Sequence, residues 1–91
     1  MKYAVKFTAQ FKKDIKLAKK QGKNIEKMFN VVEQLANGVI LDAKFRDHEL
    51  SGEYKGCREC HIEPDWLLIY ERFDDILVLV LNRIGSHSTL F

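Results

Sequence analysis

The chain has 91 residues, of which 46% are hydrophobic and 31% are charged, and its formal net charge is +2. This composition is typical of a soluble globular protein and excludes a disordered chain. We expect one domain over residues 1–91, because this length suffices for a single modest core. The longest apolar run, at residues 76–81, is far shorter than the roughly 18 residues of a membrane span. With two cysteines and no apolar signal core at the start, the sequence predicts a cytoplasmic protein without a disulfide scaffold or a membrane contact.

The charge is distributed unevenly along the chain. Residues 1–27 carry nine lysines against two acidic residues, whereas the remaining residues carry six basic and eleven acidic side chains. One interpretation is a solvated helix face that balances an acidic body. The other is a docking surface for the phosphates of a nucleic acid. The candidate RNA-binding lysines of this segment are Lys12, Lys13, Lys16, Lys19 and Lys20.

Two helices are predicted in the first part of the chain, after a short strand. The alternating residues 3–7 predict that strand. Thr8 suits the N-cap of a helix that runs to about residue 21, and Gly22 suits its end. Asn24 suits the N-cap of a second helix, whose apolar residues repeat at intervals of three and four. Because the link is short, we expect the two helices to form an antiparallel hairpin.

The rest of the chain predicts strands. Residues 40–56 are rich in charge and indicate irregular structure with one short strand near residues 48–50. The run at residues 76–81 is apolar on both faces, as expected of a central strand covered on each side. The sequence thus predicts an α+β fold, in which an N-terminal strand and a two-helix antiparallel hairpin pack on a mostly antiparallel C-terminal sheet. Its three C-terminal strands are expected at residues 57–63, 66–73 and 76–82.

The string C-R-E-C-H at residues 57–61 matches the C-x-x-C-H pattern of haem attachment. That attachment requires export to an oxidising compartment, which the sequence does not predict. Because the segment predicts a strand, Cys57 and Cys60 should lie on opposite faces, which argues against a disulfide or a shared zinc ion. We therefore expect two small buried thiols, with no metal site and no cofactor.

All three histidines, His48, His61 and His87, lie in polar segments near the ends of predicted strands. His61 shares a strand face with Glu59 and precedes Asp65 by four residues. Because the ordinary pKa of an imidazole is about 6.5, two imidazoles and a carboxylate suffice for acid–base catalysis without a metal. The alternative is that each is an ordinary surface histidine.

The chain ends in R-I-G-S-H-S-T-L-F at residues 83–91. A terminal segment is usually frayed. This one carries Arg83, His87 and Phe91, which suit the binding of a phosphate and a stacked base.

Five stretches together resemble the YafQ-like branch of the RelE/ParE toxin superfamily. They cover essentially the whole chain in the right order, and the chain length and the order of elements agree with the family. The H-x-x-P-D-W and G-S-H-x-x-L-F patterns are specific in combination. The matching stretches are F-K-K-D at residues 11–14, D-H-E-L-S-G at 47–52, Y-K-G-C-R-E-C-H at 54–61, P-D-W-L-L-I-Y at 64–70 and R-I-G-S-H-S-T-L-F at 83–91.

The resemblance implies the toxin of a type II toxin–antitoxin pair, an endoribonuclease (mRNA interferase) that cuts mRNA on the translating ribosome. It implies three partners, which are a cognate antitoxin, the ribosome through its RNA, and mRNA. The free toxin is expected to be a monomer that forms a hetero-oligomer with the antitoxin. Two rival classes stay open, namely a ParE-like toxin that binds DNA gyrase without catalysis, and an inactive interaction domain.

The functional residues of the family are carried over by motif. The catalytic set falls on His48, His61, Asp65 and His87. The positions for activity and RNA contact fall on Trp66, Arg83 and Phe91, of which Arg83 matches a basic residue beside the scissile phosphate. Glu49 replaces the proline of the family's usual D-H-P-L, and this loss is expected to loosen the loop that holds His48.

The expected chemistry is attack of the ribose 2′-OH on its adjacent phosphate, which leaves a 2′,3′-cyclic phosphate and a 5′-OH. The reaction needs a base, an acid and a cation for the phosphorane charge. We expect Asp65 or His61 as the base and His87 as the acid. Arg83 and His48 would then stabilise charge.

Trp66 and Phe91 are the aromatic candidates for stacking on splayed bases, each contact being worth roughly 1–3 kcal/mol. The alternative for Trp66 is half-buried support of the hairpin. The lysine-rich helix would bind ribosomal RNA, with an affinity that falls steeply as salt rises.

Overall fold

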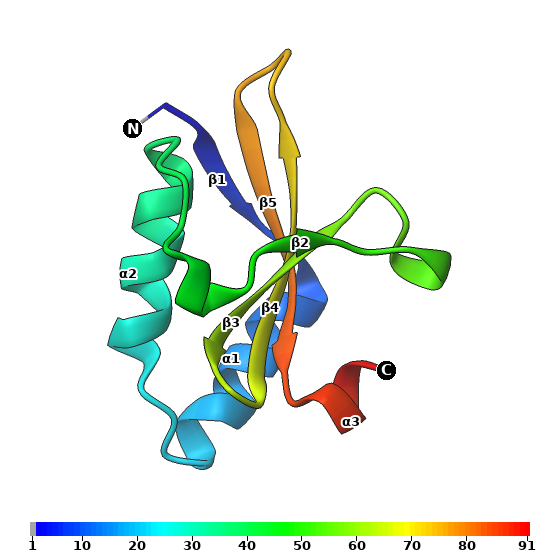
Figure 1. Ribbon diagram of the computed structural model, residues 1–91. Helices are drawn as coiled ribbons and strands as arrows, with labels where there is room; N and C mark the ends of the chain where they lie inside the picture. Colours follow the sequence, from blue (N-terminus) through cyan, green and yellow to red (C-terminus); the bar gives the residue numbers. More distant parts are fainter. Residues whose placement is uncertain (1) are drawn as a thin grey trace.

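A computed structural model describes residues 2–91, and Figure 1 shows its single twisted sheet with two helices on one face. The α+β class and the order of elements predicted from the sequence are confirmed. The elements are β1 (Ala4–Phe7), α1 (Ala9–Lys20), α2 (Ile25–Ala36), the 3-10 turn η1 (Ala43–Phe45), β2 (His48–Glu49), the 3-10 turn η2 (Gly52–Tyr54), β3 (Arg58–Glu63), β4 (Trp66–Phe73), β5 (Val78–Gly85) and α3 (His87–Leu90).

The five strands lie in the order β1-β5-β4-β3-β2, so β4 is the central strand. β1 runs parallel to β5, and the other three pairings are antiparallel. The mostly antiparallel sheet is therefore as predicted. The parallel pairing is possible because the α1–α2 hairpin and the segments that follow it lie between β1 and β5 in the sequence.

The ends of the first two helices are set by the residues that the sequence indicated. The hydroxyl of Thr8 accepts a hydrogen bond from the Phe11 amide at 3.0 Å, and the side chain of Asn24 accepts one from the Lys27 amide at 3.1 Å. Gly22 has a φ of +74° in the link, a conformation that favours glycine. Each cap satisfies a backbone amide that the helix itself leaves free.

The core has two parts, one on each face of the sheet. The main part packs α1 and α2 on the inner side chains of the sheet, among them Leu68, Tyr70 and Leu81. The smaller part lies on the opposite face and consists of Cys57, Leu67, Ile69 and Leu90, with Leu50 and Tyr54 against it. Because β4 alternates between the two parts, every residue from Trp66 to Tyr70 is buried.

The position of the last strand differs from the prediction. The sequence predicts residues 76–81 as a central strand, but Ile76 and Leu77 are 64% and 44% exposed and lie in the turn before β5. Leu77 has a φ of +52°, and β5 extends from Val78 to Gly85. The strand buried on both faces is β4 instead. An apolar run does not mark where a hairpin turns, and this one begins inside its turn.

The end of the chain is anchored rather than frayed. The hydroxyl of Ser86 caps α3 by accepting a hydrogen bond from the Thr89 amide at 3.3 Å. Leu90 is buried in the smaller part of the core, whereas Phe91 stays 53% exposed. Over residues 2–91, no helix has the length and apolar character required to cross a lipid bilayer.

Candidate active site

The candidate site lies on the sheet face opposite α1 and α2. His48 of β2 lies directly across from Glu59 of β3, and His61 of β3 lies across from Leu67 of β4. Residues that oppose each other in a sheet share a face. Since Leu67 belongs to the smaller part of the core, these polar side chains occupy that face as well.

A buried carboxylate lies between the first two histidines. The Glu59 side chain is 6% exposed, and its Oε1 is 3.0 Å from His61 Nε2 and 4.0 Å from His48 Nε2. The two imidazole rings are 6.2 Å apart between centroids. The sequence analysis placed Glu59 on the same strand face as His61 but gave it no function. Its position two residues before a candidate catalytic histidine in a strand was the signal that could have identified it.

Both ring nitrogens of His61 make contacts within the site. Its Nδ1 is 3.3 Å from the carbonyl oxygen of Pro64, while its Nε2 faces Glu59. Both partners are acceptors when Glu59 is ionised. Each ring nitrogen of His61 therefore lies against an acceptor, which leaves neither of them directed at open solvent.

The loop that holds His48, in which Glu49 replaces the family's usual proline, makes several side-chain contacts. The Nδ1–H of His48 donates to the carbonyl oxygen of Arg46 at 2.6 Å. The preceding residue, Asp47, accepts hydrogen bonds from the Tyr70 hydroxyl at 2.6 Å and from Arg58 Nε at 3.3 Å. These contacts leave Nε2 of His48 turned towards the site.

Asp65 and His87 meet where the β3–β4 turn approaches α3. The backbone amide of His87 donates to Asp65 Oδ1 at 2.9 Å. The same turn contributes the Pro64 carbonyl to His61. Three of the four predicted catalytic residues are therefore tied to this turn, and His48 joins them through Glu59.

Phe91 forms an aromatic cluster with His87 and Tyr54. The rings of His87 and Phe91 are 5.0 Å apart, and those of Tyr54 and Phe91 are 5.4 Å apart in an edge-on arrangement. The Tyr54 hydroxyl donates to the carbonyl oxygen of Leu90 at 3.0 Å. Tyr54, which sequence reasoning did not single out, thus holds the chain end in place while the exposed ring of Phe91 is open to a ligand.

Arg83 lies on the site face at the edge of β5, opposite Ile69 of β4. Its Nε is 2.9 Å from a carboxylate oxygen of Asp14. This hydrogen bond raises the pKa of the guanidinium further above its ordinary value, and the nearby Tyr54 acts in the same direction. Arg83 therefore supplies a permanent positive charge beside the aromatic cluster.

The position of Trp66 does not agree with the prediction that this side chain contacts RNA. It is 1% exposed and belongs to the main part of the core, on the helix side of the sheet. A ring without exposed surface offers no face for a base, so the structure supports the alternative that Trp66 holds the fold. The alternation of β4 explains this placement, because its neighbour Leu67 faces the site instead.

The five predicted RNA-binding lysines form a surface of their own, apart from the histidines. Phe11, Asp14 and Ala18 make the buried stripe of α1, which leaves the lysines on its solvent side. We call this surface the α1 lysine face. All of its members are exposed, and they are Lys12, Lys13, Lys16, Lys19 and Lys20.

The two cysteines lie on opposite faces of the sheet, as predicted. Cys60 belongs to the main part of the core and Cys57 to the smaller part, and both are free thiols. Burial raises the pKa of each thiol, most strongly at Cys60, so both stay protonated near neutral pH. Among residues 2–91, no three His, Cys, Asp or Glu side chains are arranged to hold a metal ion.

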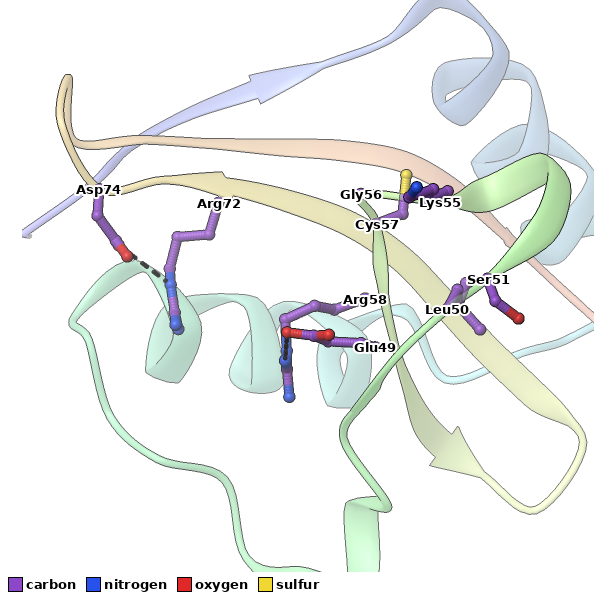
Figure 2. Close-up of a pocket in the computed structure, with 9 residues that line it drawn as sticks. All are labelled: Glu49, Leu50, Ser51, Lys55, Gly56, Cys57, Arg58, Arg72 and Asp74. Atoms are coloured by element: carbon purple, nitrogen blue, oxygen red, sulfur yellow. Dashed lines mark ion pairs between the residues drawn. The ribbon is translucent and has the colours of Figure 1, made fainter.

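A groove next to the site runs from Glu49 to the end of β4 (Figure 2). Its two arginines are paired, since Arg58 Nη1 is 3.6 Å from Glu49 and Arg72 Nε is 3.3 Å from Asp74. None of the four predicted catalytic residues lines it, so the groove is not part of the histidine cluster. It is lined by Glu49, Leu50, Ser51, Lys55, Gly56, Cys57, Arg58, Arg72 and Asp74.

The fold and this histidine-rich face agree with one class of small bacterial toxins. The sequence model of the family described as "Bacterial toxin of type II toxin-antitoxin system, YafQ" matches residues 3–91. The chain belongs to this family.

Similar proteins match this chain over nearly its full length. The chain is 40% identical over 88 residues to the mRNA interferase toxin YafQ of Escherichia coli strain K12, which covers 96% of this chain and 94% of the relative. The crystal structure of YafQ from E. coli strain BL21(DE3) superposes with a TM-score of 0.91 at 38% identity, covering 98% of each chain. A crystal structure of the E. coli DinJ–YafQ complex matches with a TM-score of 0.89 at 39% identity, again over 98% of each chain.

Proposed function

We propose that this protein is an mRNA interferase, the toxin of a type II toxin–antitoxin pair that cleaves mRNA on the translating ribosome. One observation carries the proposal: His48 and His61 flank the buried Glu59 on the site face, which also carries Arg83, and Asp65 meets the His87 amide at the turn that contacts His61. The similarity to the E. coli relative, an mRNA interferase toxin, supports it. A module that only binds a partner has no need of so many titrating groups in one place.

Asp65 is the favoured base for the ribose 2′-OH. Of the two candidates from the sequence, His61 has both ring nitrogens against acceptors and so lacks a free lone pair. Asp65 is exposed, and the His87 amide engages one of its oxygens, which leaves the other for the substrate. Geometry therefore favours the carboxylate.

His87 then acts as the acid that protonates the departing 5′-oxygen. Its imidazole is exposed and packs against the exposed ring of Phe91, so a substrate can reach it. Arg83 and His61 stabilise the negative charge that develops on the phosphorane. His48 supports this pair through its contact with Glu59. Since the 2′-OH is the nucleophile, DNA would not be cleaved.

Binding and chemistry use different surfaces. Phe91 offers an exposed ring on which a splayed base can stack. The α1 lysine face supplies charge for the phosphates of ribosomal RNA, whose attraction is independent of sequence. Loss of one of these lysines should weaken binding without altering bond cleavage.

A cognate antitoxin is the proposed protein partner in the cytoplasm. The similar YafQ chain from E. coli forms a complex with DinJ. By analogy, the free toxin would be a monomer that forms a hetero-oligomer with its own antitoxin. Contact of the antitoxin with the histidine face or with the α1 lysine face would block one of the two surfaces that the reaction needs.

A cell-free translation reaction tests the nuclease against the gyrase-binding rival. Purified protein and its His87→Ala variant are added, cleavage of the translated mRNA is mapped by primer extension, and the new ends are analysed. The proposal expects cuts on translated message only, ending in a cyclic phosphate and absent with the variant. Intact message with continuing translation would reject it, and loss of gyrase supercoiling would then support the rival.

A further inference from the structure

Asp14, which the chemistry above does not use, is a buried carboxylate on the sheet-facing side of α1. The residue is 7% exposed, and each of its carboxylate oxygens accepts two hydrogen bonds. Oδ2 accepts from Arg83 Nε at 2.9 Å and from the Ile84 amide at 3.1 Å. Oδ1 accepts from Arg83 Nη2 at 3.2 Å and from Gln10 Nε2 at 3.0 Å. The two bonds to Arg83 form a bidentate contact, which fixes orientation as well as distance.

The sheet topology explains why a carboxylate is needed there. β1 pairs with β5 only as far as the partners Phe7 and Leu81, so the last residues of β5 lack a strand on that side (Figure 1). The start of α1 takes the place of that strand. The Thr8 hydroxyl donates to the carbonyl of Asn82 at 2.8 Å, and Asp14 accepts from the Ile84 amide. A buried amide without such a partner would be costly.

This contact also decides which part of Arg83 is available. Asp14 occupies the Nε and Nη2 edge of the guanidinium and Tyr54 also lies close to it, so the N–H groups outside these contacts are the ones left for another anion. The guanidinium is a rigid planar fork, so holding one edge fixes the direction of the other. Arg83 is partly exposed and lies on the site face, where a phosphate would meet it.

We propose that Asp14 is a positioning residue of the cleavage reaction, which acts through Arg83 by holding the guanidinium against the scissile phosphate. The inference rests on the proposed nuclease function. It assigns two tasks to α1, since the same helix carries the α1 lysine face on its solvent side and supports the catalytic arginine on its buried side.

The test is a double-mutant cycle on ribosomes programmed with a cleavable mRNA, at saturating toxin and in a single turnover. The variants are Asp14→Asn, Arg83→Ala and the double variant. Glu33→Gln is the matched control, because it makes the same charge change on an exposed residue of α2. Asn keeps the shape of the side chain and one acceptor oxygen.

We expect Asp14→Asn to slow cleavage by about 10- to 100-fold, the cost of a misplaced catalytic group, with a half-saturating concentration within about twofold of wild type. In the Arg83→Ala background the same substitution should add less than about twofold, because its target is already gone. Glu33→Gln should match wild type.

Two controls distinguish positioning of Arg83 by Asp14 from a purely structural role of Asp14, namely a test that each variant is folded and chemical rescue. Cleavage is measured at a temperature at which every variant is shown to be folded by circular dichroism. Added guanidinium ion should restore part of the activity of Arg83→Ala but none of the activity of the double variant, since only Asp14 can hold the ion. Equal losses from Asp14→Asn in both backgrounds, or equal rescue, would overturn the inference while leaving the nuclease intact. A wild-type protein that does not cleave would overturn both.

Discussion

The two faces of the sheet bury similar side chains but use them differently. On the helix side, Trp66 is enclosed in the main part of the core, and the α1 carboxylate of Asp14 has four donors, two of them from an arginine that is always charged. On the site face, Glu59 is equally buried, but its partners among residues 2–91 are two imidazoles. Imidazoles gain and lose protons near neutral pH. Contacts on the first face are therefore permanent and hold groups in place, whereas those on the second involve groups that can exchange protons, so acid–base chemistry belongs to the site face.

The largest effect is expected on the helix side. Trp66→Ala should lower the free energy of unfolding by about 3–5 kcal/mol, because it leaves a large cavity in the main part of the core. Urea denaturation measures the loss, and Leu17→Ala, at an exposed position on α1, is the control that should change little. A Trp66→Ala protein of unchanged stability that fails to bind RNA would return Trp66 to the RNA-contact set.

On the site face, Glu59→Gln should affect catalysis instead. The substitution keeps the shape but removes the charge between His48 and His61, so single-turnover cleavage should fall by about 100-fold, the size of an acid–base contribution. The free energy of unfolding should change by less than about 1 kcal/mol, because the glutamine amide keeps a hydrogen bond to His61 while the cost of burying a carboxylate is removed. Full activity of Glu59→Gln would remove Glu59 from the site.

Next to His87, the substitution Phe91→Ala should weaken substrate binding and leave the free energy of unfolding unchanged. Loss of one stacked base is worth roughly 1–3 kcal/mol, which appears as a higher half-saturating concentration of programmed ribosomes. Phe91→Tyr keeps the ring and should bind normally. A fall in the maximal rate with unchanged binding would show that Phe91 acts by orienting His87.

On the α1 lysine face, Lys16→Ala should reduce the salt dependence of ribosome binding. The slope of log affinity against log salt should become shallower by about one, with the cleavage rate at saturation unchanged. Lys6→Ala on β1 is the control, since Lys6 lies outside this face. An unchanged slope for Lys16→Ala would favour the interpretation of these lysines as a solvated surface.

The smallest effect is expected at Asp74, whose carboxylate is exposed, in contrast to the buried carboxylates of Asp14 and Glu59. The Tyr3 hydroxyl donates to Asp74, and this hydrogen bond lowers the pKa of the Asp74 carboxyl below its ordinary value of 3.8. A lowered pKa contributes stability above the unfolded-state value, and this contribution is lost as pH falls through the folded-state value. Tyr3→Phe should therefore melt slightly below wild type at pH 6, and the two should converge near pH 2. A difference that persists at low pH would have another cause.

Local features of this fold were predictable because they depend on neighbouring residues. Thr8 and Asn24 cap helices through atoms three residues away, and strand alternation placed Cys57 and Cys60 on opposite faces. The family motifs located the four catalytic candidates, which the structure places around one turn and one carboxylate. Turn positions were less predictable, since nothing in the apolar residues 76–81 separates those in the turn from those in β5.

Contacts between residues far apart in the chain could not be predicted from the sequence. Asp14 meets Arg83 and Ile84 across 69 and 70 residues, and Tyr54 meets Leu90 across 36. The role of Trp66 depended on which face of β4 packs against the helices, a choice that alternation alone leaves open. These contacts follow from topology, which brings α1 to the open edge of β5.

The central claim is that protons on imidazoles drive cleavage, and the pH dependence of the single-turnover rate tests it most directly. With Asp65 as the base and His87 as the acid, the rate on programmed ribosomes should fall as pH rises from 5.5 to 8.5, because the acid must carry the proton that it gives to the departing 5′-oxygen. A bell-shaped profile would move the role of base to a histidine. A rate that stays flat from pH 5.5 to 8.5 would contradict the account.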